Sequence, residues 1–194
     1  MSVSKGRILM KSTLMLAVVT EIAMAMAAMF GAEHADHAAE MTTPKAAVAV
    51  LIPTEGNSVQ GVIRLKVIGE SLEITGQVSG LKPGEHGFHI HEFGDLTAAD
   101  GTAAGGHYNP SGHEHGGPDA ADHHAGDLGN ITADDKGIAT VNKVSKDLKL
   151  PMIMGRSFVV HAGVDDLKSQ PSGDAGPRVA VGVIGYTKEA PPTK

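Results

Sequence analysis

The chain has 194 residues and a formal net charge of -6, with 41% hydrophobic, 20% charged and 3% aromatic residues. This length suits one domain with a substantial core plus a tail. The acidic balance argues against nucleic acid as a partner, because binding it needs a basic face that displaces counterions from phosphates. The absence of cysteine excludes disulfides, thiolate zinc sites and thiol catalysis.

The first 27 residues are predicted to be a signal peptide. Three basic residues precede an apolar run over 14–30, and Ala25-Met26-Ala27 is typical of a cleavage site. The alternative is a membrane anchor that is never cut, but Glu21 places a charge inside the apolar run. The favoured interpretation is export to the periplasm or the extracellular space, with no stable membrane association after cleavage.

The chain after the signal peptide divides into a linker, a domain and a tail. Residues 28–45 lack an apolar period and are predicted to be a flexible linker, in which His34 and His37 most simply belong to a solvated segment. Residues 46–188 form the predicted domain, and 189–194 a C-terminal tail.

Eight strands are predicted along the domain, and no convincing helix. Alternating apolar residues or short apolar runs between turn signals mark them at 46–52, 63–67, 72–78, 87–93, 128–133, 138–142, 157–161 and 178–185. Turn residues between the first four indicate three hairpin-like connections and therefore an antiparallel sheet. The sequence thus predicts an all-β fold, an eight-stranded antiparallel Greek-key β-barrel or sandwich.

Two long loops interrupt the strands, at 94–126 and at 162–177. Loops of this length inside a compact domain usually have a function. The first contains five histidines and is followed by an aspartate: His107, His113, His115, His123, His124 and Asp127. Metal coordination could order a segment that hydrophobic burial cannot.

His89 and His91 stand two residues apart in the predicted fourth strand. Side chains at i and i+2 leave the same face of a strand about 6.6 to 7 Å apart, which lets two imidazoles converge on one metal ion. By itself such a pair could equally be polar residues on a solvated face. Nine of the eleven histidines lie between His86 and His161, however, and imidazole suits copper and zinc.

Several motifs, in this order along 46–186, resemble the copper/zinc superoxide dismutase family. They are GEHGFHIHEFGD (84–95), GHYNP (106–110), HGGP (115–118), HAGDLGN (124–130), VVH (159–161), DDL (165–167) and GPRVAVGVIG (176–185). The resemblance implies that two superoxide anions and two protons become O2 and H2O2 as copper cycles between Cu(II) and Cu(I), while zinc is structural. A homodimer is compatible with it, although dimer surfaces in the family differ between lineages.

Carried over residue by residue, the resemblance implies two metal sites that share one histidine. The copper ligands would be His89, His91, His107 and His161. The zinc ligands would be His107, His115, His124 and Asp127. His107 would also take up and deliver a proton.

The resemblance also assigns roles to residues around the metals. Arg178 would attract and dock the superoxide anion, and Asp165 would link a copper-ligand to a zinc-ligand histidine. His86 is expected to brace the backbone. His113 and His123, which match no family role, are expected to be solvated.

The chain departs from the family pattern at one cross-link. Most members tie the long loop to the last strand by a disulfide, whereas Gly101 and Val181 occupy those positions here.

Two rival functions are an exported copper/zinc buffer and a metal-dependent hydrolase. Arg178 counts against the buffer because storage needs no anion dock, and the full zinc shell counts against the hydrolase.

Overall fold

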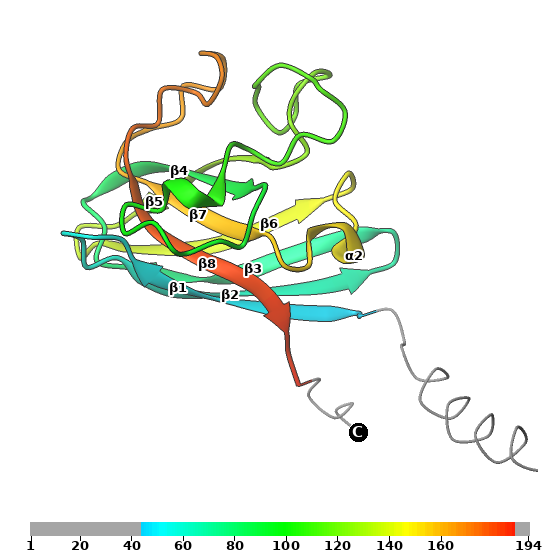
Figure 1. Ribbon diagram of the computed structural model, residues 1–194, viewed down its shortest axis with the longest axis horizontal. Helices are drawn as coiled ribbons and strands as arrows, with labels where there is room; N and C mark the ends of the chain where they lie inside the picture. Colours follow the sequence, from blue (N-terminus) through cyan, green and yellow to red (C-terminus); the bar gives the residue numbers. More distant parts are fainter. Residues whose placement is uncertain (1–43, 189–194) are drawn as a thin grey trace, which may run out of the picture. The chain divides into compact units, whose positions relative to one another are not determined.

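The computed structural model describes residues 44–188, so the predicted signal peptide, residues 28–43 of the linker and the tail lie outside the described part. Eight strands are present: β1 (Ala46–Pro53), β2 (Gln60–Ile68), β3 (Ser71–Ser79), β4 (Gly84–His91), β5 (Asp127–Ala133), β6 (Ile138–Ser145), β7 (Ser157–His161) and β8 (Arg178–Tyr186). They form one closed barrel in the order β1-β2-β3-β6-β5-β4-β7-β8, all pairs antiparallel (Figure 1). The predicted all-β fold is confirmed.

One of the three predicted hairpins is wrong. β1–β2 and β2–β3 pair as neighbours, but β3 pairs with β6, and β4 pairs with β5 and β7. The connection between β3 and β4 is therefore a crossover of the Greek-key type. Turn residues such as those at 82–84 show that the chain reverses, but they do not select the strand beside which it lands.

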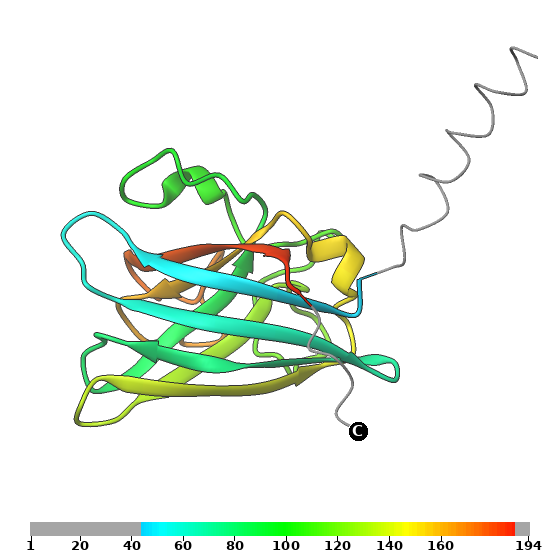
Figure 2. The same cartoon turned by 90° about the horizontal axis from the view of Figure 1, so that it is seen from below.

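The strands form because their apolar residues fill the barrel. In β2, buried Ile63 and Leu65 alternate with exposed Arg64 and Lys66, the period of a half-buried strand. Figure 2 shows how the strands surround the interior of the barrel. β4 is buried along 86–91 instead, because the two long loops cover its outer face.

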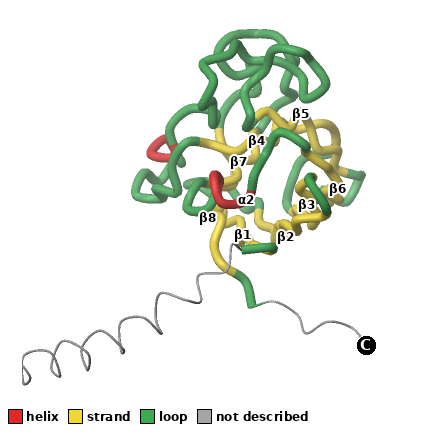
Figure 3. Tube along the Cα trace, turned by 90° about the vertical axis from the view of Figure 1, so that its right-hand side faces the viewer, coloured by secondary structure: helices red, strands yellow, loops and turns green. Residues whose placement is uncertain are grey.

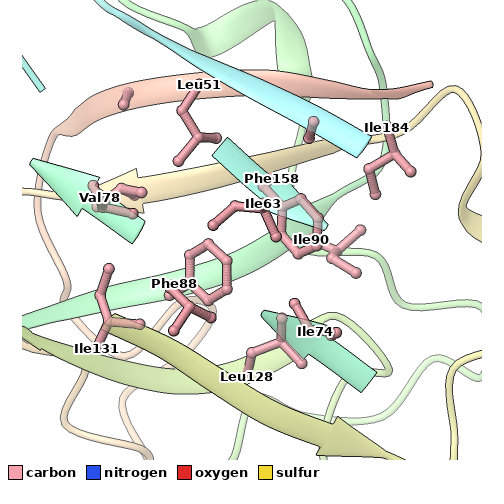
Figure 4. Close-up of a cluster of buried hydrophobic side chains, with 14 of the residues drawn as sticks. Leu51, Ile63, Ile74, Val78, Phe88, Ile90, Leu128, Ile131, Phe158 and Ile184 are labelled. Atoms are coloured by element: carbon pink, nitrogen blue, oxygen red, sulfur yellow. The ribbon is translucent and has the colours of Figure 1, made fainter. Parts of the chain in front are cut away.

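Phe88 of β4 and Phe158 of β7 mark the centre of the core. Both are fully buried, and their rings stack with centroids 5.0 Å apart among aliphatic side chains such as Ile63 and Ile74 (Figure 4). The side chains at 88 and 90 face inward, so those at 89 and 91 must face outward, beneath the loops.

The long loops lie together on the side of the barrel that carries β4, β5 and β7 (Figure 3). The first contains a short 3-10 turn, η1 (Thr102–Ala104), and a one-turn helix, α2 (Leu150–Ile153), lies in the stretch before β7. The sequence did not predict α2, whose Leu150 and Ile153 are buried. No helix within residues 44–188 is long and apolar enough to cross a membrane.

The stacked pair provides a test of the core. Phe158→Ala should lower the free energy of unfolding by about 3–5 kcal/mol, because it leaves a cavity against Phe88. Tyr186→Ala, which removes an aromatic side chain from a residue that is 73% exposed, should change it by less than about 0.5 kcal/mol. Urea unfolding of the metal-free proteins measures both, and equal losses would contradict this packing.

Candidate metal centre

Four histidines converge on the outer face of β4. His89 and His91 leave β4 on that face, His161 ends the neighbouring β7, and His107 joins them from the first loop through an isolated bridge to His91. One nitrogen from each ring lies within 4.8 Å of the others, and all four residues are buried. This group, His89, His91, His107 and His161, is called the four-histidine cluster below.

A second group of candidate ligands shares His107 and adds two histidines of the first loop and the first residue of β5. We call it the His3Asp cluster: His107, His115, His124 and Asp127, all buried and with ligand atoms again within 4.8 Å. Asp127 begins β5 opposite His89. Its Oδ1 lies 2.6 Å from His107 Nδ1 and 3.2 Å from His124 Nδ1, and its Oδ2 lies 3.1 Å from His115 Nδ1.

Both clusters fit metal ions. His89 Nδ1, His107 Nε2 and His115 Nδ1 are buried and make no hydrogen bond, and each buried polar atom left unsatisfied costs about 1–3 kcal/mol. Donors around a tetrahedral ion at 2.0–2.1 Å lie roughly 3.3 Å apart. The separations from Asp127 to His115 and to His124, 3.1 and 3.2 Å, are close to this value. Three nitrogens with one carboxylate suit zinc, and four imidazoles suit copper.

In His91 and His161, the ring nitrogen that faces away from the four-histidine cluster is hydrogen-bonded to a backbone carbonyl. His91 Nδ1 donates to the Gly105 carbonyl and His161 Nδ1 to the Gly176 carbonyl, both at 2.9 Å. Because a carbonyl can only accept, these nitrogens carry the proton. The lone pair of each Nε2 is therefore left pointing toward the cluster, as in metal-ligating histidines generally.

Asp165 joins the two clusters. Its Oδ2 accepts from His89 Nε2 at 2.8 Å and its Oδ1 from His115 Nε2 at 2.9 Å, and its side chain is fully buried. Asn130 holds the Asp165 backbone in turn, with its amide oxygen accepting from the Asp165 N–H at 2.8 Å and its Nδ2 donating to the Asp165 carbonyl at 2.9 Å. Asp165 thus contacts one histidine of each cluster.

Burial keeps the imidazoles neutral. It is the main cause that lowers the pKa of His89 to about 4 and of His161 to about 3, and it lowers the pKa of His91 well below 6.5. Burial opposes ionisation of Asp127, but hydrogen bonds from His107 and the Gly116 N–H outweigh it and lower the pKa of this carboxyl. Neutral imidazole and ionised carboxylate are the forms that bind metal.

Arg178 lies beside the four-histidine cluster. It opens β8 opposite His161, and its guanidinium donates to the Gly101 carbonyl and, at 2.5 Å, to the Gly105 carbonyl. The Gly105 carbonyl thus accepts from both Arg178 and His91. Arg178 therefore fixes the stretch of the first loop that orients a cluster histidine.

The remaining predicted histidines fall into different surroundings. His86 contacts two backbone carbonyls, of Lys82 at 2.8 Å and of His161 at 2.9 Å, as expected for a bracing residue. His113 is exposed and pairs with Asp122 at 3.1 Å. His123 was expected to be solvated, but it is half-buried and contacts the His124 carbonyl at 2.7 Å.

The position of the missing disulfide holds a small apolar contact. A Cβ built on Gly101 would lie 2.8 Å from Val181 Cγ2, and Gly101 has a left-handed φ of 78°. Val181 packs with Ala104 and Val159 in a separate buried cluster. The loop and β8 therefore meet where the family cross-link would be, through van der Waals contact and the bonds of Arg178.

Gln170 is a contact that sequence reasoning missed. Its side-chain oxygen accepts from the His115 N–H at 2.8 Å, and its Nε2 donates to the His115 carbonyl at 2.9 Å. Nothing in the sequence around Gln170 marks it, because it lies 55 residues from its partner and on the other long loop.

Comparison with known proteins agrees with this geometry. Residues 59–184 match the copper/zinc superoxide dismutase family, and the chain belongs to this family. It is 46% identical over 160 residues to the Cu-Zn superoxide dismutase of Paramecium bursaria Chlorella virus 1, which covers 77% of this chain and 82% of that protein.

A copper chaperone for superoxide dismutase from Rattus norvegicus is also 46% identical, over 143 residues that cover 70% of this chain. The match spans about half of that protein, 52%. Among solved structures, the clock protein EA4 is similar, with a TM-score of 0.69 and 38% identity over 75% of this chain and 96% of that one. The family binds copper and zinc, and its members are not all dismutases.

The depressed pKa values predict how stability depends on pH. Below pH 6.5 the unfolded chain protonates His89 and His161, which the folded metal-free chain does not until about pH 4 and 3. Stability is therefore full above 6.5 and falls as the pH is lowered, by about 1.4 kcal/mol per pH unit for each such histidine.

Urea unfolding of the metal-free protein at a series of pH values measures this slope. His161→Gln should reduce the slope by the contribution of one histidine, about 1.4 kcal/mol per pH unit. His113→Gln, at an exposed position, should leave the slope unchanged. A stability that does not vary between about pH 4 and 6.5 would contradict the burial of neutral rings.

Proposed function

We propose that this protein is a superoxide dismutase that uses copper and zinc. The observation that carries the proposal is the placement of Arg178 beside a buried four-histidine cluster, which shares His107 with a buried His3Asp cluster. Such a site combines two metal positions with a fixed cation for a small anion. Membership of the family and the similarity to the viral enzyme support it.

The ligand roles follow the two clusters. We assign copper to His89, His91, His107 and His161, and zinc to His107, His115, His124 and Asp127. Bound copper would supply the one-electron chemistry that takes two superoxide anions to O2 and H2O2, with zinc as a redox-silent structural ion. His107 faces one cluster through Nε2 and the other through Nδ1, and it holds and releases the transferred proton at Nε2.

Arg178 supplies the attraction for superoxide. A guanidinium stays charged at every physiological pH and carries five N–H donors. Backbone carbonyls of Gly101 and Gly105 engage one donor on each of Nη1 and Nη2, so others are left for an anion. Because the whole chain is acidic, with a net charge of -6, the attraction must be local.

Export belongs to the same proposal. The basic and apolar residues of 1–27 support a signal peptide, cleavage and a periplasmic or extracellular location. The homodimer remains a prediction.

The second candidate function is a copper/zinc buffer without catalysis. It is favoured by the identity to a copper chaperone, which is the same 46% as that to the viral dismutase.

Substitution of Arg178 separates the two functions. Arg178→Gln should retain about one copper and one zinc per chain but lose roughly tenfold or more in kcat/KM for superoxide, because the local anion attraction is gone. Arg178→Lys should recover part of the rate, and Lys82→Gln, an exposed cation elsewhere, should match the unchanged protein. Dismutation assays with metal analysis on the same samples measure this.

His161→Ala should abolish turnover together with copper binding. If the unchanged protein takes up both metals and does not turn over superoxide, the buffer function replaces the enzyme.

The missing disulfide predicts an unusual dependence on zinc. A disulfide that closes a long loop typically contributes 2–4 kcal/mol, and here the order of the first loop rests on the His3Asp cluster, Arg178 and the contact at Gly101. Removing zinc from the copper-loaded protein should lower the melting temperature by several degrees, and adding zinc back should restore it. Equal melting temperatures with and without zinc would refute this dependence.

A further inference from the structure

A second concentration of polar groups lies on the opposite side of the barrel from the long loops. It is a hollow of about 460 Å3 formed by β1, β2, β3 and the residues that follow β8. We name it the basic hollow after the four cations that line it, Lys45, Arg64, Lys66 and Lys188. β1 and β2 run along the lower side of the barrel in Figure 1, and the long loops project from the upper side.

The cations come together through strand register. Arg64 and Lys66 face outward from β2, about 7 Å apart. Lys45 stands at the start of β1, where its carbonyl accepts from the Val67 N–H at 2.8 Å. Lys188 follows β8, which pairs with β1 through Ala47 and Tyr186. The pairing of β1 with both β2 and β8 thus gathers charges that are up to 143 positions apart in the sequence.

None of these four cations makes an ion pair within the described part of the chain. Every ion pair among residues 44–188 involves a histidine. Lys149, Arg156 and Arg178 supply all the lysine and arginine side-chain hydrogen bonds in that range. Glu73 is the one acidic residue of the hollow, opposite Lys66 in register but not within 4.0 Å of it. The hollow is a cationic site on an acidic protein.

We propose that the basic hollow binds a small organic polyanion, a molecule with an apolar body and two or more phosphate, sulfate or carboxylate groups. The volume lies in the range of small-molecule sites, about 300–1,000 Å3. Ala46, Val67 and Thr75 supply an uncharged lining for the body of the ligand. The four cations supply charge-assisted hydrogen bonds, and Arg64 can grip an oxyanion with two donors.

This site is separate from the metal centre. None of its residues belongs to either cluster, and Arg178 and Lys188 stand at opposite ends of an extended segment that spans roughly 30 Å. Occupation of the basic hollow should therefore leave dismutation unchanged. The inference also holds whether or not the protein turns over superoxide.

Fluorescence titration with naphthalenetrisulfonate tests the proposal on the metal-loaded protein. This probe has an apolar ring system and three anionic groups, and sulfonates are weak metal ligands. We expect saturable binding to one site per chain, weakened by added salt. The double variant Arg64→Gln/Lys66→Gln should raise the Kd about tenfold or more, because it removes two charge-assisted contacts.

A matched control removes the same charge elsewhere. Lys82→Gln/Lys136→Gln, at two exposed positions outside the hollow, should change the Kd by less than about twofold. Equal weakening in both double variants would overturn the proposal, since general charge would then explain the binding, and so would the absence of saturable binding. Binding that appears only after Glu33, Asp36, Glu40 and Glu189 are replaced by amides would overturn it too, because the chain's own acids would then occupy the cations.

Discussion

The candidate metal centre depends on hydrogen bonds that join buried imidazoles to fixed oxygens, through the ring nitrogens that face away from the clusters. Asp165 holds His89 and His115, and backbone carbonyls hold His91 and His161. These bonds decide which nitrogen carries the proton and therefore which one faces the cluster. Burial then keeps the rings neutral. Without such hydrogen bonds, the rings could rotate away from a shared centre.

The barrel serves this site as a rigid platform with one covered face. Inward-facing Phe88 and Ile90 lock β4 into the core, and the intervening histidines are consequently aimed outward at a defined spacing. The first long loop then supplies His107, His115 and His124, while Asp127 at the start of β5 and His161 at the end of β7 complete the two clusters. The long loops are linked to each other by Gln170, and the first loop is linked to β8 by Arg178, so hydrogen bonds between side chains and backbone help to order the loops.

Charge is distributed unevenly over this acidic chain. The carboxylates of Asp127 and Asp165 are buried and contact histidines of the two clusters. Arg178 lies beside the four-histidine cluster and carries the opposite charge. Among the described residues, four further cations gather in the basic hollow on the far side of the barrel. The two proposed anion sites would both act through local charge, because the net charge of -6 repels anions overall.

The sequence by itself determined the strands, the all-β class and the candidate ligands. Period-two alternation reports burial directly, and His-x-His, GHYNP and HAGDLGN carry the family pattern in short stretches. It misplaced the partner of β3 and overlooked α2, because turn residues show where a chain reverses and not where it lands. Only the tertiary structure decided that Gln170 clamps His115, that Gly105 serves both Arg178 and His91, and that Lys45 and Lys188 share a hollow. These contacts join residues far apart in the chain, and such pairing depends on how strands and loops pack together, which has no local signature.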